Sequence, residues 1–446
     1  MSILSRKTPY ILLVGDIVFF VLSLWTALFV RYGSIPEKQV FLGHLAPFSI
    51  LFVVWVVVYF IAGLYEQKTS VLRNNLSQRL LSTQIINSAL AAVFFYFVTF
   101  TSIAPKTNLL VYLGVSLLFA FAWRRFAYPI MSMRRREQAI LIGRGAEVTE
   151  LEREVNGNSR YHFEFVLTID LDKDASGVAR GLLSSKIAEG GISAVVVDFY
   201  DSKAQAMLPE LYELLFAKVR FVDMHRVYEE VFSRVALSLL NHSWFLENVS
   251  AYPKYAYDAL KRAMDFAIAL GLGTVSLVIY PFVFLAIKLD DGGAIFIMQE
   301  RVGRDGAIIR IPKFRSMKAS DRGVWVKEND DRITRVGKIL RTSRIDELPQ
   351  LLSVLKGDMS LVGPRPDIKA LGIDLSSQIP YYAMRNIIKP GLSGWAQTRQ
   401  ELPPQSLEET KMRLAYDFYY IKYRSLFLDL KIALQTLATL ASRMGK

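Results

Sequence analysis

Two adjacent carboxylates, Asp346 and Glu347, lie in a part of the chain that is rich in basic residues. This part covers residues 313–395 and includes the stretches KFRSM, RTSRIDELPQLLSVLKGDMSLVGPRP and KPGLSGWAQ. The basic residues near its proline and glycine turns are Lys313, Arg315, Arg341, Arg344, Lys356, Arg365 and Lys389. Cations neutralise phosphate charge, and a carboxylate can attack phosphorus or bind a metal ion. The composition therefore predicts a site that binds phosphate and does chemistry on it.

The phosphate contacts are expected from basic side chains at turns or at the ends of secondary-structure elements. Arg365 lies between two prolines that fix the backbone on both sides, so its guanidinium loses less entropy when it binds. Trp395 is compatible with stacking on a base and with anchoring in a membrane interface. The predicted substrate-binding residues are Lys313, Arg315, Arg344, Pro364, Arg365, Pro366 and Lys389.

The acidic pair also has a purely structural interpretation. The sequence Ser343-Arg344-Ile345-Asp346 matches a helix capping box, in which acids of the first turn interact with the helix dipole. Taken alone this interpretation is favoured, but the surrounding motifs favour the functional one. A helix start is also a natural phosphate site, and Pro349 is tolerated in a first turn, so it keeps the pair near that start.

A divalent metal would have to use few protein ligands, because no Asp-x-Asp pair lies near the carboxylates. Mg²⁺ usually keeps waters and binds one or two carboxylates together with substrate phosphates. Glu347 is the first predicted ligand. Asp358 in the GDMS stretch is the second, although a turn-capping aspartate is the favoured interpretation there. The chain has no cysteine, and its four histidines lack metal-ligand spacing.

Six ordered motifs give the chain a family resemblance: DGGAIFIMQERVGRDG, KFRSM, DRITRVGKILR, DELPQ, GDMSLVGPRP and KPGLSGWAQ. Over about residues 257–443 it resembles the polyprenyl-phosphate phosphoglycosyl transferases of bacterial sugar-transferase type. The upstream part looks like the long form of this family, the undecaprenyl-phosphate galactose or glucose phosphotransferase type, although that similarity is architectural and weaker.

The resemblance implies a reaction and assigns roles within it. A sugar-1-phosphate would pass from a UDP-sugar to undecaprenyl phosphate with release of UMP. This is the first membrane step in the synthesis of O-antigen, capsule or exopolysaccharide. The resemblance makes Asp346 the nucleophile that forms a covalent aspartyl-phosphosugar intermediate. Glu347 would then bind the metal or activate the lipid phosphate, with Mg²⁺ as the cofactor.

The composition of the 446 residues, 52% hydrophobic with positive mean hydropathy, predicts a membrane protein. Apolar runs cover about residues 9–30, 45–64, 85–103 and 109–130, each near the roughly 20 residues of a spanning helix. Asp16 lies within the first run and is expected to snorkel or to pair with another helix.

Basic residues at the ends of these runs indicate the orientation. Arg6 precedes the first run, Lys68 lies between the second and third, and Arg134 follows the fourth. The positive-inside rule places these ends in the cytoplasm, which predicts a bacterial inner-membrane protein with a cytoplasmic catalytic domain. The net charge of +13 suits anionic lipid head groups and pyrophosphate. No recognisable nucleic-acid-binding module is present in the sequence, so nucleic acid is not an expected partner.

Residues 133–250 alternate short strands and helices, which predicts a Rossmann-like soluble domain with a mostly parallel sheet. Gly143-Arg144-Gly145 follows the first strand, where a dinucleotide fingerprint would begin. Val148 occupies the position of the third glycine, however, which disfavours a bound cofactor. The favoured interpretation is a degenerate nucleotide fold used for packing, regulation or the formation of a homodimer.

A fifth apolar run, at about residues 263–287, is interrupted by Pro281. A full span would carry the catalytic motifs outside, away from cytoplasmic nucleotide sugars, and basic residues flank both ends. A re-entrant helix over about 260–289 that bends near Pro281 resolves this conflict. The resemblance implies the same helix, although Tyr280 stands where the family often has serine. Residues 414–444 mix aromatic and basic residues and predict amphipathic helices in the interface, with a core-packing helix as the alternative.

The predicted fold class is thus a membrane protein with three parts. An α-helical transmembrane bundle covers residues 1–132, a Rossmann-like α/β domain 133–250, and a monotopic, α-rich catalytic domain 251–446. Two other functions remain open from the sequence alone. One is a membrane enzyme that modifies nucleotide sugars with a dinucleotide bound near Gly143, and the other is a non-catalytic scaffold for glycan assembly.

Overall fold

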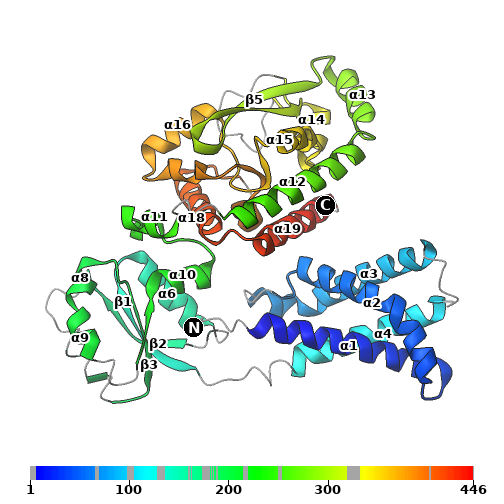
Figure 1. The fold of residues 1–446 in the computed structure, drawn as a ribbon, viewed down its shortest axis with the longest axis horizontal. Helices are drawn as coiled ribbons and strands as arrows, with labels where there is room; N and C mark the ends of the chain where they lie inside the picture. The colour runs from blue at the N-terminus through cyan, green and yellow to red at the C-terminus, as the bar shows by residue number, and fades with distance from the viewer. Residues whose placement is uncertain are drawn as a thin grey trace. The chain divides into compact units, whose positions relative to one another are not determined.

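A computed structural model describes residues 7–65, 70–97, 105–127, 136–158, 161, 163–172, 181, 183, 185–186, 189–213, 219–249, 254–318, 332–400 and 403–444. The chain divides into two compact units, Met1–Val231 and Phe232–Lys446. The first contains a group of long helices and a small sheet, and the second is mostly helical (Figure 1).

Four helices of the first unit are long and apolar enough to cross a membrane, within the part of the chain that the structure describes. They are α1 (Lys7–Tyr32), α2 (Lys38–Ile61), α3 (Ser70–Phe97) and α4 (Pro105–Ala122). Aromatic rings fill their core: Phe20, Phe48, Trp55 and Tyr112 are at most 1% exposed. Large apolar side chains also point outward, as expected where the surrounding solvent is lipid. The predicted membrane helices are confirmed. The flanking residues Arg6, Lys68 and Arg134 lie outside the described residues, so the orientation stays a prediction.

Asp16 forms the interhelical pair that the sequence offered as one of two outcomes. Its partner Arg124 lies in a short π-helical segment, η1 (Trp123–Ala127), that continues α4. The Nε atom of Arg124 donates to Asp16 Oδ1 at 3.2 Å, and its Nη1 donates to the carbonyl of Leu64 at 2.7 Å. Both charged side chains are almost fully buried. The pair therefore joins α1 to the end of α4 and to the turn after α2.

The α/β part of the first unit contains a four-stranded parallel sheet, as predicted. Its strands are β1 (Glu137–Gly143), β2 (Phe163–Asp170), β3 (Ile192–Val197) and β4 (Arg220–Asp223), and its helices include α6 (Ala146–Gly157), α8 (Ser202–Ala206), α9 (Leu208–Glu213) and α10 (Met224–Phe232). The strand order β2-β1-β3-β4 places the change of direction between β1 and β3, where doubly wound sheets bind ligands.

The loop after β1 is packed by side chains of the protein itself. A Cβ added at Gly143 would lie 2.6 Å from Met224 Sδ and 3.0 Å from a methyl group of Val148. Arg144 Nε lies 2.7 Å from Asp201 Oδ2, so an ion pair joins the segments that follow β1 and β3. Val148 and Met224 therefore pack directly against the backbone at Gly143.

The boundary between the units differs from the predicted domain boundary at residue 250. Residues 235–249 include η3 (Leu237–Leu239) and α11 (His242–Asn248) and pack in the second unit. The reason is aromatic packing: Trp244 and Phe245 lie against Phe418, and Phe245 also lies against Tyr381.

The fifth apolar run forms two helices, α12 (Tyr255–Ser276) and α13 (Tyr280–Asp291), bent by 57°. Pro281 lies in the first turn of α13, where its missing N–H leaves no helical bond unmade. Arg262 of α12 donates to two carbonyls in the last turn of α15 (Leu351–Lys356), at 2.6 and 2.7 Å. Asp265 accepts from Ser360 Oγ at 2.7 Å. The bend near Pro281 is present, whereas its location in one membrane leaflet stays a prediction.

The remaining elements of the second unit follow the bent helix pair in the chain. They are β5 (Phe296–Val302), η4 (Arg304–Gly306), β6 (Ile308–Phe314), α14 (Arg335–Thr342), η5 (Ile345–Gln350), β7 (Ser360–Val362), α16 (Lys369–Gln378), η6 (Tyr382–Ile387), β8 (Gly391–Ser393), α17 (Trp395–Arg399), α18 (Leu407–Tyr423) and α19 (Leu426–Met444). Strands β5 and β6 form an antiparallel hairpin, and β7 and β8 a short parallel pair. Helix α18 buries Leu414, Phe418 and Tyr420, so it is the core-packing helix that was the alternative to an interfacial one. Helix α19 exposes Phe427 and Leu430.

Replacing Arg124 by methionine is expected to destabilise the helical bundle, because Asp16 would remain as an unpaired buried charge. Removing one partner of a buried pair costs about 3–5 kcal/mol. Arg125→Met is the matched control, because Arg125 is exposed and lies over the ring of Phe126. Thermal unfolding of the purified protein in detergent checks this, and equal midpoints for the two variants would rule out a stabilising role for the pair.

Candidate active site

The acidic pair lies in η5, directly after a backbone turn at Arg344. Arg344 has a φ of 59°, in the left-handed region that non-glycine residues seldom adopt. The capping box, the alternative interpretation of the acidic pair, is not formed: Ser343 follows the last residue of α14, and its Oγ donates back to the carbonyl of Ile339 at 2.8 Å. The turn at Arg344 instead places the Arg344 side chain beside Glu347, with Nη1 3.2 Å from Oε1.

Glu347 is surrounded by cations from three separate segments. Its Oε1 atom accepts hydrogen bonds at 2.6, 3.2 and 3.4 Å from Arg365 Nη2, Arg344 Nη1 and Lys313 Nζ. Burial alone would raise the pKa of Glu347, but these cations outweigh burial and hold the pKa well below its usual range. Burial, aided by the nearby Arg365, lowers the pKa of Lys313. Glu347 is therefore a permanent carboxylate that neutralises part of a cationic cluster.

Asp346 differs from its neighbour although it is next to it in sequence. It is 6% exposed, and burial raises its pKa, with the charge of Glu347 adding to the effect of burial. Its Oδ1 atom is buried and accepts no hydrogen bond within the described part of the chain. A desolvated carboxylate oxygen without a donor is well suited to attack an electrophile or to bind a cation.

The loop that carries Arg365 is fixed against the strand pair β7 and β8. A Cβ added at Gly391 would lie 2.1 Å from the backbone nitrogen of Gly363, so both positions must lack side chains. Gly391 N donates to the carbonyl of Pro364 at 3.0 Å. The predicted rigidity around Arg365 thus has two sources: the prolines and this close contact between two backbone segments.

Three predicted residues lie outside the cluster around Glu347. Arg315 lies beside Gly293, where an added Cβ would overlap its guanidinium. Lys389 Nζ lies near Gly357, 3.6 Å from where a Cβ would be, and burial together with Arg262 lowers its pKa. Asp358 lies in the turn that ends α15, with its N–H donating to the carbonyl of Ser353 at 3.0 Å.

Trp395 is a core residue. It is 2% exposed, its Nε1 donates to the carbonyl of Ser233 at 2.9 Å, and its ring stacks on Tyr419. Both roles considered from the sequence need an exposed ring, so both are wrong for this structure. Arg399 and Lys431 also lie over the ring, 4.1 and 5.4 Å from its centroid.

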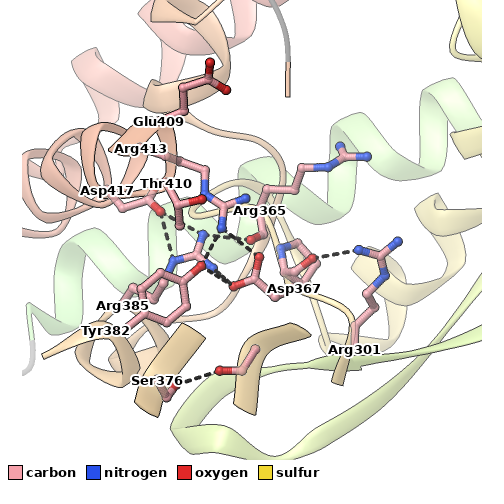
Figure 2. A network of polar contacts seen from close by, with 12 residues as sticks. Arg301, Arg365, Asp367, Ser376, Tyr382, Arg385, Glu409, Thr410, Arg413 and Asp417 are labelled. Carbon is pink, nitrogen blue, oxygen red and sulfur yellow. Dashed lines mark hydrogen bonds and ion pairs between the residues drawn. The ribbon is translucent and has the colours of Figure 1, made fainter. Parts of the chain in front are cut away.

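A second polar network, which the sequence did not indicate, lies behind the Arg365 loop (Figure 2). Its members are Arg301, Asp367, Tyr382, Arg385, Arg413 and Asp417. The sequence hints at this network only through charged residues that have aromatic neighbours in the chain, as Arg385 has in YYAMRN and Asp417 in AYDFYY. Such a residue is expected to be paired when buried, but its partner cannot be read from local sequence.

Opposite stability effects are expected from neutralising the two neighbouring carboxylates. The folded pKa of Asp346 is raised, so its ionised form opposes folding at neutral pH. Asp346→Asn should raise the free energy of unfolding by about 1 kcal/mol, and this gain should disappear below roughly pH 3.9. The folded pKa of Glu347 is depressed, so its contribution is present above roughly pH 4.3 and is lost as the pH falls. Glu347→Gln should therefore lower stability by about 3–5 kcal/mol at pH 7.

Thermal unfolding at pH 7 and at pH 4 measures both effects. The exposed Asp358 provides a control through Asp358→Asn, which should leave the midpoint unchanged. Shifts of the same sign for Asp346→Asn and Glu347→Gln would show that the two carboxylates do not differ as described.

Known proteins are similar to this chain in sequence. A sequence model of the family described as "Bacterial sugar transferase" matches residues 256–443. The UDP-N-acetylgalactosamine-undecaprenyl-phosphate N-acetylgalactosaminephosphotransferase of Aeromonas hydrophila is 36% identical over 260 residues, which cover 56% of this chain and 60% of that protein. The UDP-glucose:undecaprenyl-phosphate glucose-1-phosphate transferase of Caulobacter vibrioides is 44% identical over 192 residues, covering 42% of this chain and 72% of that protein.

A third relative, the exopolysaccharide production protein PSS of Rhizobium leguminosarum bv. phaseoli, is 38% identical over 192 residues. These residues make up 41% of this chain and 96% of that protein. This chain thus spans 60% of the length of the Aeromonas relative but nearly the whole of the Rhizobium one. The matched region contains both carboxylates and the cations that surround Glu347, and the chain belongs to the bacterial sugar transferase family.

Proposed function

We propose that the protein transfers a sugar-1-phosphate from a UDP-sugar to undecaprenyl phosphate and releases UMP. The product would begin a surface polysaccharide such as an O-antigen, a capsule or an exopolysaccharide. The observation that carries the proposal is the contrast between a carboxylate held by three cations, Glu347, and a buried carboxylate with an unpartnered oxygen, Asp346. The names of the Aeromonas and Caulobacter relatives support the lipid acceptor and the nucleotide donor.

The proposed chemistry consists of two displacements at one phosphorus. An oxygen of Asp346 attacks the phosphorus that bears the sugar, the bond to the bridging oxygen breaks, and UMP leaves with the electron pair. An oxygen of undecaprenyl phosphate then attacks the same phosphorus. The acyl–phosphate bond breaks, the Asp346 carboxylate is regenerated, and the product is a lipid diphosphate sugar.

The cations support this chemistry by neutralising charge. Arg344 and Arg365 each donate one hydrogen bond to Glu347. Guanidinium groups suit the oxygens of a pyrophosphate, whose negative charge would otherwise repel the Asp346 carboxylate. Glu347 keeps the guanidinium groups in place before the substrate arrives.

We also propose Mg²⁺ as the cofactor. Carboxylate oxygens are its preferred protein ligands, and the unpartnered Asp346 Oδ1 fits this requirement. Glu347 remains the proposed ligand through its second oxygen, since its Oε1 is already occupied by cations. The bound metal would supply charge neutralisation at the pyrophosphate.

The bent helix pair α12 and α13 supports a monotopic arrangement. The apolar side chains around the bend are highly exposed: Leu277, Val278, Phe282 and Leu285 are each at least 60% exposed. Lys288, near the end of α13, lies on the far side of the bend from Lys261 and Arg262. A re-entrant helix would bury the apolar bend in lipid and keep both basic ends at the cytoplasmic surface of the inner membrane.

A direct assay tests the reaction. The purified protein in detergent with Mg²⁺ is expected to release UMP from one of a panel of UDP-sugars. Repeated turnover should occur only when undecaprenyl phosphate is present. Chelation of Mg²⁺ should stop the release, and adding Mg²⁺ back should restore it. No release from any donor by a folded protein would refute the proposed reaction.

Trapping of the intermediate tests the role of Asp346. With a UDP-sugar labelled in the sugar and without lipid acceptor, the wild-type protein should acquire one label that hydroxylamine removes and that added undecaprenyl phosphate discharges. Asp346→Asn should acquire none and should lose at least about 10³-fold in turnover. The control Asp374→Asn lies on the exposed surface of α16 and should behave as wild type. Normal labelling of the Asp346→Asn protein would remove Asp346 as the nucleophile.

A further inference from the structure

The loop around Arg365 is held mainly through its carbonyl groups. Pro364 and Pro366 have no N–H, so this stretch offers few donors of its own and must be fixed by donors from elsewhere. Three of these donors come from the β5 segment and β8: Gly391 N to Pro364 O at 3.0 Å, Arg301 Nη1 to Pro366 O at 3.0 Å, and Val302 N to Asp367 O at 2.9 Å.

Arg385 supplies the fourth contact, to Arg365 itself. Its Nη2 donates to the carbonyl of Arg365 at 2.8 Å, and its Nη1 contacts the carboxylate of Asp367. One guanidinium therefore binds the chain on both sides of Pro366. Figure 2 shows Arg385 behind the loop, while the side chain of Arg365 extends away from it.

Asp417 of α18 fixes the orientation of Arg385. Its Oδ2 accepts from Nε at 2.9 Å and from Nη2 at 2.7 Å, and the two side chains are 2% and 1% exposed. Arg413 and Tyr382 bind Asp367 at 2.9 and 2.8 Å. The two buried aspartates thus face Arg385 and Arg413, so the charges of these four side chains balance.

We propose that Arg385, oriented by Asp417, is a positioning residue for Arg365. It fixes the Arg365 carbonyl, and the guanidinium of Arg365 then reaches Glu347 Oε1 at 2.6 Å and presents its other donors to the substrate. This inference rests on the proposed function for its kinetic consequences, but the loop geometry itself does not.

The test uses a replacement that keeps the buried charge balanced. The double variant Arg385→Met/Asp417→Leu removes one cation and one anion together and leaves Asp367 with Arg413, so folding should be retained. UMP release is expected to show a kcat lower by about 10- to 100-fold, because a misplaced group costs about that much in rate. The KM for the UDP-sugar should change by less than about threefold. The control Thr410→Val, at a buried position of α18 where the hydroxyl donates to the carbonyl of Ser406, should stay within about twofold of wild type.

Adding the double replacement to a variant that lacks the Arg365 guanidinium distinguishes two roles of Arg385: positioning of Arg365 and general stabilisation of the fold. In Arg365→Ala protein the same double replacement should lower kcat by less than about twofold, because the group to be positioned is already gone. The full loss appearing again in this background would overturn the inference. So would an unchanged kcat in the double variant. If the double variant does not fold, Arg385→Lys takes its place: it keeps the charge but has one nitrogen for three acceptors, and the same non-additivity is expected.

Hydrogen exchange gives a readout that does not depend on activity. The amides of Gly363, Arg365 and Asp367 should exchange at least about tenfold faster in the double variant and in Arg385→Lys, and at the wild-type rate in Thr410→Val. Unchanged exchange in both Arg385 variants would overturn the inference, even if Arg365→Ala abolishes turnover. A wild-type protein that releases no UMP would instead refute the proposed function, and the exchange rates would still decide whether Arg385 positions the loop.

Discussion

Cancellation of charge around Glu347 is the constraint on which the second unit depends. Lys313 comes from the end of β6, Arg344 from the turn before η5, and Arg365 from the loop after β7, yet all three meet one carboxylate oxygen. Without Glu347 these three partly buried cations would lose the carboxylate that they share and would repel one another. The packing of these segments and the arrangement of the charged groups in the candidate site therefore depend on each other. The cations are already in place around Glu347 before any substrate binds.

Helix α12 is part of the same arrangement. Arg262 binds the last carbonyls of α15, the helix that follows the acidic pair, and Asp265 binds Ser360 at the start of β7, which leads to Arg365. Both residues come from α12. A displacement of this helix would thus reach the segments that carry the carboxylates and Arg365 through direct hydrogen bonds.

The sequence predicted what depends on local pattern. Long apolar runs predicted the membrane helices, and the alternation of short strands and helices predicted the parallel sheet. The density of arginine near Asp346 and Glu347 indicated the candidate site. The break near Pro281 was also predicted, because proline acts on its own helix. Features that depend on distant partners were missed or wrong: Trp395 was expected to be exposed, but it is covered by Tyr419 and Arg399. The network behind Arg365 could not be predicted either, since its charges pair across segments far apart in the chain.

Arg344 carries a consequence for the evolution of the protein. Its left-handed backbone costs roughly 1–2 kcal/mol relative to a residue in the ordinary helical region, and glycine would adopt the same conformation without that cost. Glycine would also remove the guanidinium that the turn brings to Glu347. Selection for thermal stability alone would therefore favour glycine at position 344. Selection for enzyme activity would oppose glycine there, and the residue present is arginine.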